Sequence, residues 1–95
     1  MLQVALFKLI TGEEVIGKIV KDEETSIVLD DIRSLIVQQS GQGQVGVALV
    51  PWFTGMHEGE IKIEKVHIVG TPISRIPKQL EDVYLEQTSK IQLKL

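Results

Sequence analysis

Residues 9–29 read LITGEEVIGKIVKDEETSIVL, and this stretch decides the fold. An apolar run ends at the turn Thr11-Gly12-Glu13, and residues 14–21 then alternate with the period of two that is typical of a strand. The acidic turn at residues 22–26 separates this segment from a third apolar segment that begins at Ile27. Strands joined by such short turns pair back on one another, so the stretch predicts consecutive antiparallel hairpins.

Further strands are predicted on both sides of this stretch. Residues 2–10 are almost wholly apolar and form the first strand, and the Asp30-Asp31 pair is expected to bend or bulge the third. Residues 45–53 carry apolar side chains on both faces, so this fourth strand is predicted to be buried on both faces. A fifth strand is predicted over residues 61–69, with a bulge near Glu64-Lys65 where the alternation slips.

The apolar period changes after Gly70-Thr71-Pro72. Residues 77–88 show the three-and-four spacing of a short helix, and residues 91–95 alternate as a tail strand would. Eleven Val and twelve Ile against two Ala favour a mainly β chain. We therefore predict one domain over residues 1–95: a five-stranded, strongly bent antiparallel barrel over about 2–70 with a short C-terminal helix. The alternative is an open antiparallel sheet packed under the helix.

The size of the chain predicts self-association. A domain of 95 residues buries only roughly 60–65% of the surface of its unfolded form, and the absence of cysteine excludes disulfides. A barrel of five short strands keeps unpaired edges, which are an aggregation hazard unless another copy covers them. We expect a closed homo-oligomer through the edge strands around 45–53 and 61–69. Replacing Val47 or Leu49 with Asp is expected to disperse it.

Charge is distributed unevenly along the chain. The net charge is −3, but residues 13–31 hold seven acids against two lysines, and the remainder holds six acids against eight bases. A broad basic footprint for nucleic acid is thus excluded, and any such binding must be local. The uncharged run over 45–53 is too short to span a membrane, and the N-terminus is typical of a first strand and not of a signal peptide.

The motifs with chemical meaning have simple structural interpretations. Residues 41–46, GQGQVG, match G-x-G-x-x-G, but a Val-rich run leading to Pro51 follows in place of a helix, so a hairpin loop is predicted. His57 lies beside Glu58 and Glu60, a weak ligand set for a divalent ion. Neither His57 nor His67 has a nucleophile at a recognisable spacing. We therefore expect no catalysis, no bound metal and no cofactor.

The adjacent aromatic residues Trp52 and Phe53 offer a surface on which a nucleic-acid base can stack. Neighbouring residues on a strand face opposite sides, so at least one of the two packs in the core or in an interface. Trp52 is the candidate for stacking.

The residues from Leu9 to Ile19, followed by Asp22 and Ile27-Val28-Leu29, resemble the first motif of the Sm and LSm proteins, which include the Hfq type. In that motif a strand leads to a glycine turn, and an apolar residue, a glycine and another apolar residue follow. Phe53-Thr54-Gly55 lies where the second motif usually reads Ile-Arg-Gly. The resemblance covers roughly residues 4–69. Residues 71–89 are similar to those of Sm-like proteins carried by cyanobacterial phages.

The resemblance implies a bent five-stranded barrel that joins edge to edge into rings and binds single-stranded RNA. In the family an aromatic or His residue stacks on the base, an Asn binds the base edge and an Arg supports both. Those positions fall here on Glu24 or Thr25, on Ser26 and on Thr54, so each base-reading group is replaced.

We accordingly expect a ring-forming Sm-like protein that binds single-stranded RNA or DNA through another surface, with a role in RNA or DNA processing. The expected contact residues are Thr25, Ser26, Arg33, Trp52, Thr54, Gly55 and His57, with Lys62, Lys65, Arg75 and Lys78 as further cations. The alternative is a structural or protein-interaction ring without nucleic acid. The expected location is the cytoplasm, that of the host cell if the protein is phage-encoded.

Overall fold

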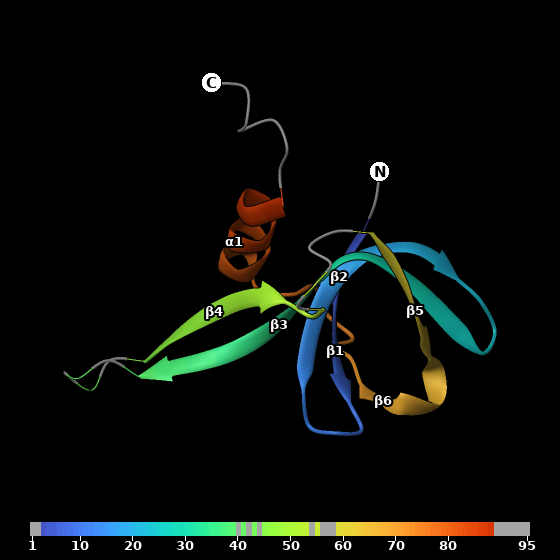
Figure 1. The fold of residues 1–95 in the computed structure, drawn as a ribbon, viewed down its shortest axis with the longest axis horizontal. Coiled ribbons are helices and arrows are strands. Elements are labelled where there is room, and N and C mark those ends of the chain that lie inside the picture. The colour runs from blue at the N-terminus through green and yellow to red at the C-terminus, as the bar shows by residue number, and fades with distance from the viewer. Residues whose placement is uncertain are drawn as a thin grey trace.

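Six antiparallel strands and one helix form the part of the chain that the structure describes, which comprises residues 3–39, 41, 43, 45–53, 55 and 59–88 of this computed structural model (Figure 1). The elements in chain order are β1 (Gln3–Leu9), β2 (Glu14–Asp22), β3 (Ser26–Gln39), β4 (Val45–Pro51), β5 (Glu60–Glu64), the 3₁₀ turn η1 (Lys65–His67), β6 (Ile68–Gly70) and α1 (Lys78–Thr88). The prediction of a mainly β chain with a short C-terminal helix is confirmed.

The long strand β3 organises the sheet. One edge of β3 pairs with β2, and the other edge pairs with β5 along Ser26 to Asp30 and with β4 along Arg33 to Gln39. β1 pairs with β2 and, at its end, with β6, so the strand order is β4-β3-β2-β1-β6 with β5 also on β3. β3 pairs with the following strand β4 from Gln39 and Val45 onward, which confirms the hairpin interpretation of residues 41–46.

Two expectations about this sheet are wrong. It has six strands instead of five, because η1 divides the predicted strand 61–69 into β5 on β3 and β6 on β1. The slip in apolar alternation near Glu64-Lys65 reflects this 3₁₀ turn and not a bulge. The sheet is also not closed: β5 pairs with β3, β6 pairs with β1, and β5 and β6 do not pair with each other.

The bend in β3 arises at a bulge, as predicted at Asp30-Asp31. Ile16 pairs with Arg33 and Lys18 pairs with Asp30, so β3 carries one more residue than β2 across this interval. Asp31 has a φ of 53°, a conformation that only a few per cent of residues other than glycine adopt. An extra residue in one strand bends that strand and increases its twist. Figure 1 shows β3 turning away from the other strands of the curved body after this point.

Gly17 lies opposite the bulge because a side chain does not fit there. A Cβ at this position would lie 3.2 Å from the Cβ of Leu29 and 3.4 Å from the carbonyl oxygen of Asp30. We expect Gly17→Val to lower the free energy of unfolding by about 1–3 kcal/mol, the usual cost of overpacking a close contact. Urea unfolding at one protein concentration measures this loss. Gly70→Val is the control, because a Cβ at Gly70 meets no atom within 4 Å; equal losses in the two variants would contradict the prediction.

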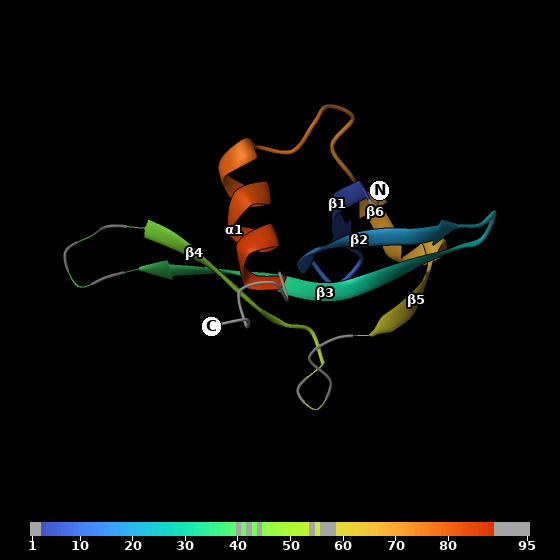
Figure 2. The same ribbon diagram turned by 90° about the horizontal axis from the view of Figure 1, so that it is seen from above.

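Two apolar clusters lie on opposite faces of the sheet. The concave face holds the first: Phe7, Leu9, Val15, Ile27, Leu29, Ile32 and Ile63. The second lies between the sheet and α1 and contains Ile16, Leu49, Ile76 and Tyr84. Figure 2 shows α1 covering one face near the middle of the sheet. Neighbouring residues of β2, Val15 and Ile16, therefore enter different clusters, which explains why the apolar residues of this chain are not confined to one face.

Tyr84 connects the helix to the bulge. Its side chain is fully buried, and its hydroxyl donates to the carbonyl oxygens of Asp31 at 2.8 Å and Asp30 at 3.2 Å. Burial, followed by the negative charge of Asp31, raises the pKa of Tyr84 far above its usual value. Thr88 closes the last turn by donating from its hydroxyl to the carbonyl oxygen of Tyr84. The position of α1 is thus fixed against the bend of β3. No described helix is long and apolar enough to cross a membrane.

Candidate functional site

The β2–β3 turn brings Thr25 and Ser26 next to the start of η1. The backbone N–H of Lys65 donates to the carbonyl oxygen of Thr25 at 2.9 Å. Ser26 is buried, and its hydroxyl donates to Oε1 of Glu23 at 3.1 Å. Thr25 remains exposed. Two of the expected contact residues therefore lie together, at the end of the sheet where β2, β3 and β5 meet.

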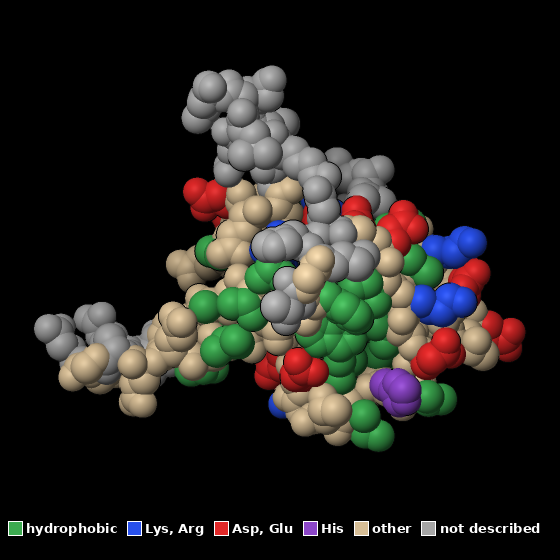
Figure 3. Space-filling model, in the orientation of Figure 1, with side chains coloured by type: hydrophobic (Ala, Val, Ile, Leu, Met, Phe, Trp, Pro, Cys, Tyr) green, Lys and Arg blue, Asp and Glu red, His purple; other side chains and the backbone are tan. Residues whose placement is uncertain are grey.

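Three lysines surround this turn, and two of them are paired with acids. Lys65 Nζ lies 2.6 Å from Asp22 Oδ1, and Lys21 Nζ lies 3.5 Å from Glu23 Oε2. The hydrogen bond from Ser26 and the charge of Lys21 hold the pKa of Glu23 below its usual value, so this carboxylate stays ionised to a lower pH than a free glutamate does. Figure 3 shows Lys and Arg side chains standing beside Asp and Glu at this end of the molecule.

Lys62 is the cation at this end that forms no ion pair with another described residue. Its side chain is exposed. Lys62 of β5 pairs with Val28 of β3, and on the other side of β3 the same Val28 pairs with Lys21 of β2. Lys21 and Lys62 thus flank Val28 on one face of three adjacent strands. We call Lys21, Lys62 and Lys65 the lysine patch; the three acids of the adjoining turn, Asp22, Glu23 and Glu24, offset its charge.

Trp52 lies at the other end of β2, away from the lysines. Its indole N–H donates to Glu13 Oε2 at 3.2 Å, and Glu13 belongs to the turn between β1 and β2. The Trp52 ring packs edge to face against Phe53, with centroids 5.4 Å apart and planes at 83°. Trp52 is also partly buried against the first apolar cluster. Gly55 follows in the same segment between β4 and β5, so the structure does not bring Trp52 and Gly55 together with Thr25.

Arg33 occupies a third place, near α1. It pairs across the sheet with Ile16, a member of the cluster beneath the helix, so the two side chains share that face. Its charge lies close enough to Tyr84 to favour ionisation of the phenol. The Arg33 Nε atom is buried and has no hydrogen-bond partner among the described residues. Arg33 is therefore separated from the lysine patch.

The remaining expected contact residues, Thr54 and His57, lie outside the described residues, as does Glu58 of the weak ligand set. Across the described residues no group of three or more His, Cys, Asp or Glu side chains is placed to hold a metal ion. Of the further cations, Arg75 and Lys78 bind acids of the helix, Glu81 and Asp82.

A projecting β3–β4 hairpin carries uncovered apolar side chains. Val37 and Val47 face each other across this hairpin and are 70% and 54% exposed, and Ile36 on its opposite face is 44% exposed. We call residues 35–39 and 45–49 the arm; Figures 1 and 2 show it extending beyond the body. Residues 34–57 contain no Asp, Glu, Lys or Arg. The outer edge of β4 therefore lacks the charges that protect most strand edges from association.

Leu49 is placed differently from Val47. Leu49 is only 6% exposed and packs beneath α1 with Ile16 and Tyr84. A charge at Leu49 would therefore damage the fold of the subunit, whereas a charge at Val47 affects only exposed surface. The sequence pattern placed both residues on one face, which is correct, but the helix covers that face only as far as Leu49.

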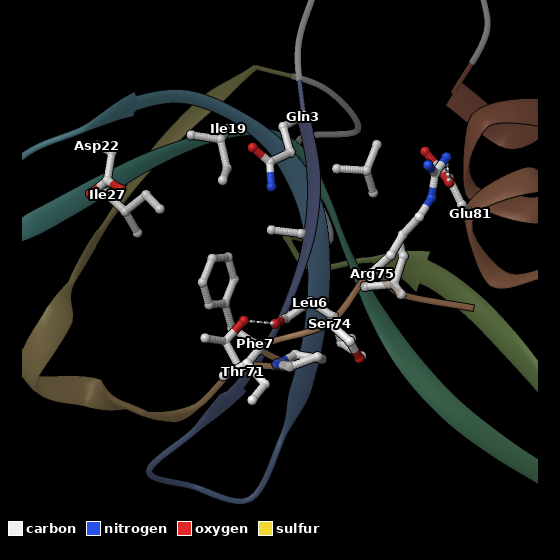
Figure 4. Close-up of a pocket in the computed structure, with 15 residues that line it drawn as sticks. Gln3, Leu6, Phe7, Ile19, Asp22, Ile27, Thr71, Ser74, Arg75 and Glu81 are labelled. Carbon is white, nitrogen blue, oxygen red and sulfur yellow. Dashed lines mark hydrogen bonds and ion pairs between the residues drawn. The ribbon is translucent and has the colours of Figure 1, made fainter. Parts of the chain in front are cut away.

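A groove of about 640 Å³ follows the free edge of β1, and the sequence pattern did not indicate it. β6 pairs with β1 only at Lys8 and Leu9, which leaves Gln3 to Phe7 without a neighbouring strand on that side among the described residues. The segment Thr71 to Ile76 forms the opposite wall, and the Thr71 hydroxyl crosses to the carbonyl oxygen of Leu6 at 2.6 Å (Figure 4). The groove exists because β6 ends after three residues and the chain then leaves for α1.

These surfaces must be interpreted from their own chemistry. No protein-family model matches this chain, and a comparison with curated proteins found no relative.

Proposed function

We propose that this chain, whose sheet is bent but open, is an Sm-like subunit of a closed homo-oligomer that binds single-stranded nucleic acid. The course of the chain supports the barrel: β1, β2, β3 and β5 curve around one apolar cluster, and a single 3₁₀ turn carries the chain from β5 on β3 to β6 on β1. The bend of β3 at Asp31 supplies the curvature that such a small barrel requires.

The arm is the observation that carries the proposal of self-association. In a single subunit Val37 and Val47 on one face of the arm and Ile36 on the other are exposed, and the outer edge of β4 has no strand beside it among the described residues. Such an edge pairs readily with another chain, and identical subunits satisfy it by forming a closed ring.

The lysine patch is the surface proposed for nucleic acid. Lys62 is exposed, so it can meet a phosphate even though its charge also acts on Glu23. Thr25, which lies against Lys65, offers a hydroxyl to a base or sugar. Each copy in an oligomer would present the same patch, so several weak contacts act on one strand. The acids beside Lys21 and Lys65 make each contact weak and strongly dependent on salt.

Fluorescence anisotropy with labelled oligo-U, oligo-A and single-stranded DNA over a salt series tests this proposal. We expect binding at low salt, and we expect Lys62→Gln to weaken it and to reduce the slope of log K against log salt by about 0.7 for each phosphate that the protein no longer neutralises. Lys78→Gln is the matched control, because it removes the same charge from α1, where Lys78 pairs with Asp82. Absence of binding to all three ligands at low salt would refute the nucleic-acid function.

A protein-interaction ring without nucleic acid is the second candidate. The observation that favours it is that Lys21 and Lys65 form ion pairs with acids and that the charge of Lys62 acts on Glu23. This candidate predicts an intact oligomer that binds none of the three oligonucleotides. It also predicts that a pull-down recovers a protein partner and that nuclease treatment leaves this recovery unchanged.

A further inference from the structure

We infer that the groove beside β1 receives the arm of a neighbouring copy, so that β4 of one subunit adds as a strand to the free edge of β1 in the next. This inference rests on the proposed homo-oligomer and specifies its contact. Strand addition of this kind derives affinity from backbone hydrogen bonds and specificity from the side chains on either side.

The free edge of β1 presents backbone N–H and C=O groups that can pair with an added strand. The Leu6 carbonyl points into the groove, as its bond from Thr71 shows. Alternate residues of a strand direct their N–H and C=O groups to the same edge, so those of Val4 also face the groove. The Leu6 carbonyl is the one of these groups that has a partner among the described residues. A strand laid along Gln3 to Phe7 would pair the others.

The apolar layers of the two strands also match. In β1, Val4 and Leu6 pack toward the cluster beneath α1, and Ala5 and Phe7 belong to the concave cluster. β4 has the same character, with Val47 and Leu49 on one face and Ala48 and Val50 on the other. A strand that is buried on both faces is expected to be apolar on both faces. Placing β4 beside β1 would extend both layers.

Charge and exposure favour the same pairing. The arm is uncharged, and at the rim of the groove Arg75 Nη2 lies 3.2 Å from Glu81 Oε1, so docking leaves neither of these two charges without its partner. Ile73 lines the groove and is fully exposed in the single subunit. An arriving apolar strand would cover it. Nucleic acid is a poor occupant of the groove, because its lining includes Asp22 and Glu81 and the one cation among the described lining residues, Arg75, is paired with Glu81.

The lengths of the strands argue against β6 as the sole receiver of β4. β4 has seven residues and β6 has three, so β6 alone would leave more than half of the β4 edge unpaired. The edge of β1 instead offers five residues, Gln3 to Phe7, on the side where β6 ends. Because the arm and the groove are different surfaces, the contact is head to tail, and the proposed ring requires that its repeated rotation adds up to one full turn.

Two charge substitutions test the inference separately from the fold. Val47→Asp alters the arm and Ile73→Asp alters the groove, and both side chains are exposed in the subunit. We expect each variant to keep the wild-type circular dichroism spectrum and to fall to the mass of one subunit, 10.6 kDa, in light scattering. Val83→Asp is the control, because Val83 is an exposed residue of α1 outside the groove lining, and it should retain the wild-type mass.

Mixing the two variants gives the decisive result. A Val47→Asp subunit keeps an intact groove and an Ile73→Asp subunit keeps an intact arm, so an equimolar mixture should form a one-to-one dimer and nothing larger. If Ile73→Asp keeps its full mass, or if the mixture stays monomeric, the arm meets a different surface and the inference is wrong. If both variants keep the wild-type mass, the oligomer stands and the inference alone fails. A wild-type protein that is itself a single subunit would refute the proposed oligomer as well.

Discussion

Replacing Tyr84 with alanine is expected to lower the free energy of unfolding by about 3–5 kcal/mol, the range for truncating a buried aromatic side chain. Tyr84 is fully buried, and the substitution would open a cavity between α1 and the sheet beside Ile16 and Leu49. The change would also remove the hydroxyl that binds the two carbonyl oxygens at the bulge. Urea unfolding followed by circular dichroism measures the effect, at one protein concentration because association adds to apparent stability.

Tyr84→Phe separates the hydrogen bonds from the packing. The ring remains, so we expect a smaller loss of about 1–2 kcal/mol, from carbonyl groups that no longer have their shared donor. A further substitution, Leu85→Ala, controls for the removal of apolar surface, because Leu85 is partly exposed on the same helix. If Tyr84→Ala cost no more than Leu85→Ala, the helix would not depend on Tyr84 for its position.

Replacing Leu49 with aspartate is expected to unfold most of the population. The substitution leaves a cavity beneath α1 and places an unpaired carboxylate among apolar side chains, at a combined cost of about 5 kcal/mol or more. A domain of this length has a total stability of about 5–14 kcal/mol, so the cost approaches the whole. Loss of the β signal in circular dichroism and of a cooperative urea transition would report it.

Val47→Asp is the matched control for Leu49→Asp. The two residues lie two positions apart on one face of β4, and Val47 is 54% exposed whereas Leu49 is 6% exposed. We expect the unfolding free energy of a Val47→Asp subunit to change by less than about 1 kcal/mol once it is compared at the monomer level. Similar losses in the two variants would mean that α1 covers more of the arm than the structure shows.

The sequence was informative where local chemistry determines structure. The turn at Thr11-Gly12-Glu13, the bulge at Asp30-Asp31 and the helix after Pro77 were all predicted to within a few residues. Each has a local signal: a glycine in a turn, paired acids that interrupt an apolar run, and a change of apolar period beginning at a proline. These features do not depend on distant parts of the chain.

The number of strands was not predicted correctly, because a short 3₁₀ turn has little signal of its own. Lys65-Val66-His67 slips the alternation by an amount that a bulge would also produce. Only the pairing partners distinguish the two cases, since β5 lies on β3 and β6 lies on β1. Pairing partners are set by the curvature of the whole sheet, which one segment of sequence does not encode.

The candidate surfaces were harder to predict than the fold. Val47 and Leu49 have equal places in the alternation, and only the extent of α1 decides which of them is exposed. Trp52 follows a strand directly, but its position beside Glu13 depends on a contact across 39 residues. The groove beside β1 depends on β6 ending early. In each case a distant element, which no local pattern describes, decides what a residue faces.

The contact of Tyr84 with the Asp30 and Asp31 carbonyl groups has a consequence for how the molecule opens. The chain from Thr71 to Ile76 runs directly into α1, so the wall of the groove is held in place by the same anchor that secures the helix to the bulge. Loss of the two Tyr84 hydrogen bonds would release α1, the groove wall at residues 71–76 and the bend of β3 together. In the proposed homo-oligomer, a subunit would thereby lose its capacity to bind neighbours when its own tertiary structure loosens, and partly folded chains would be kept out of the ring.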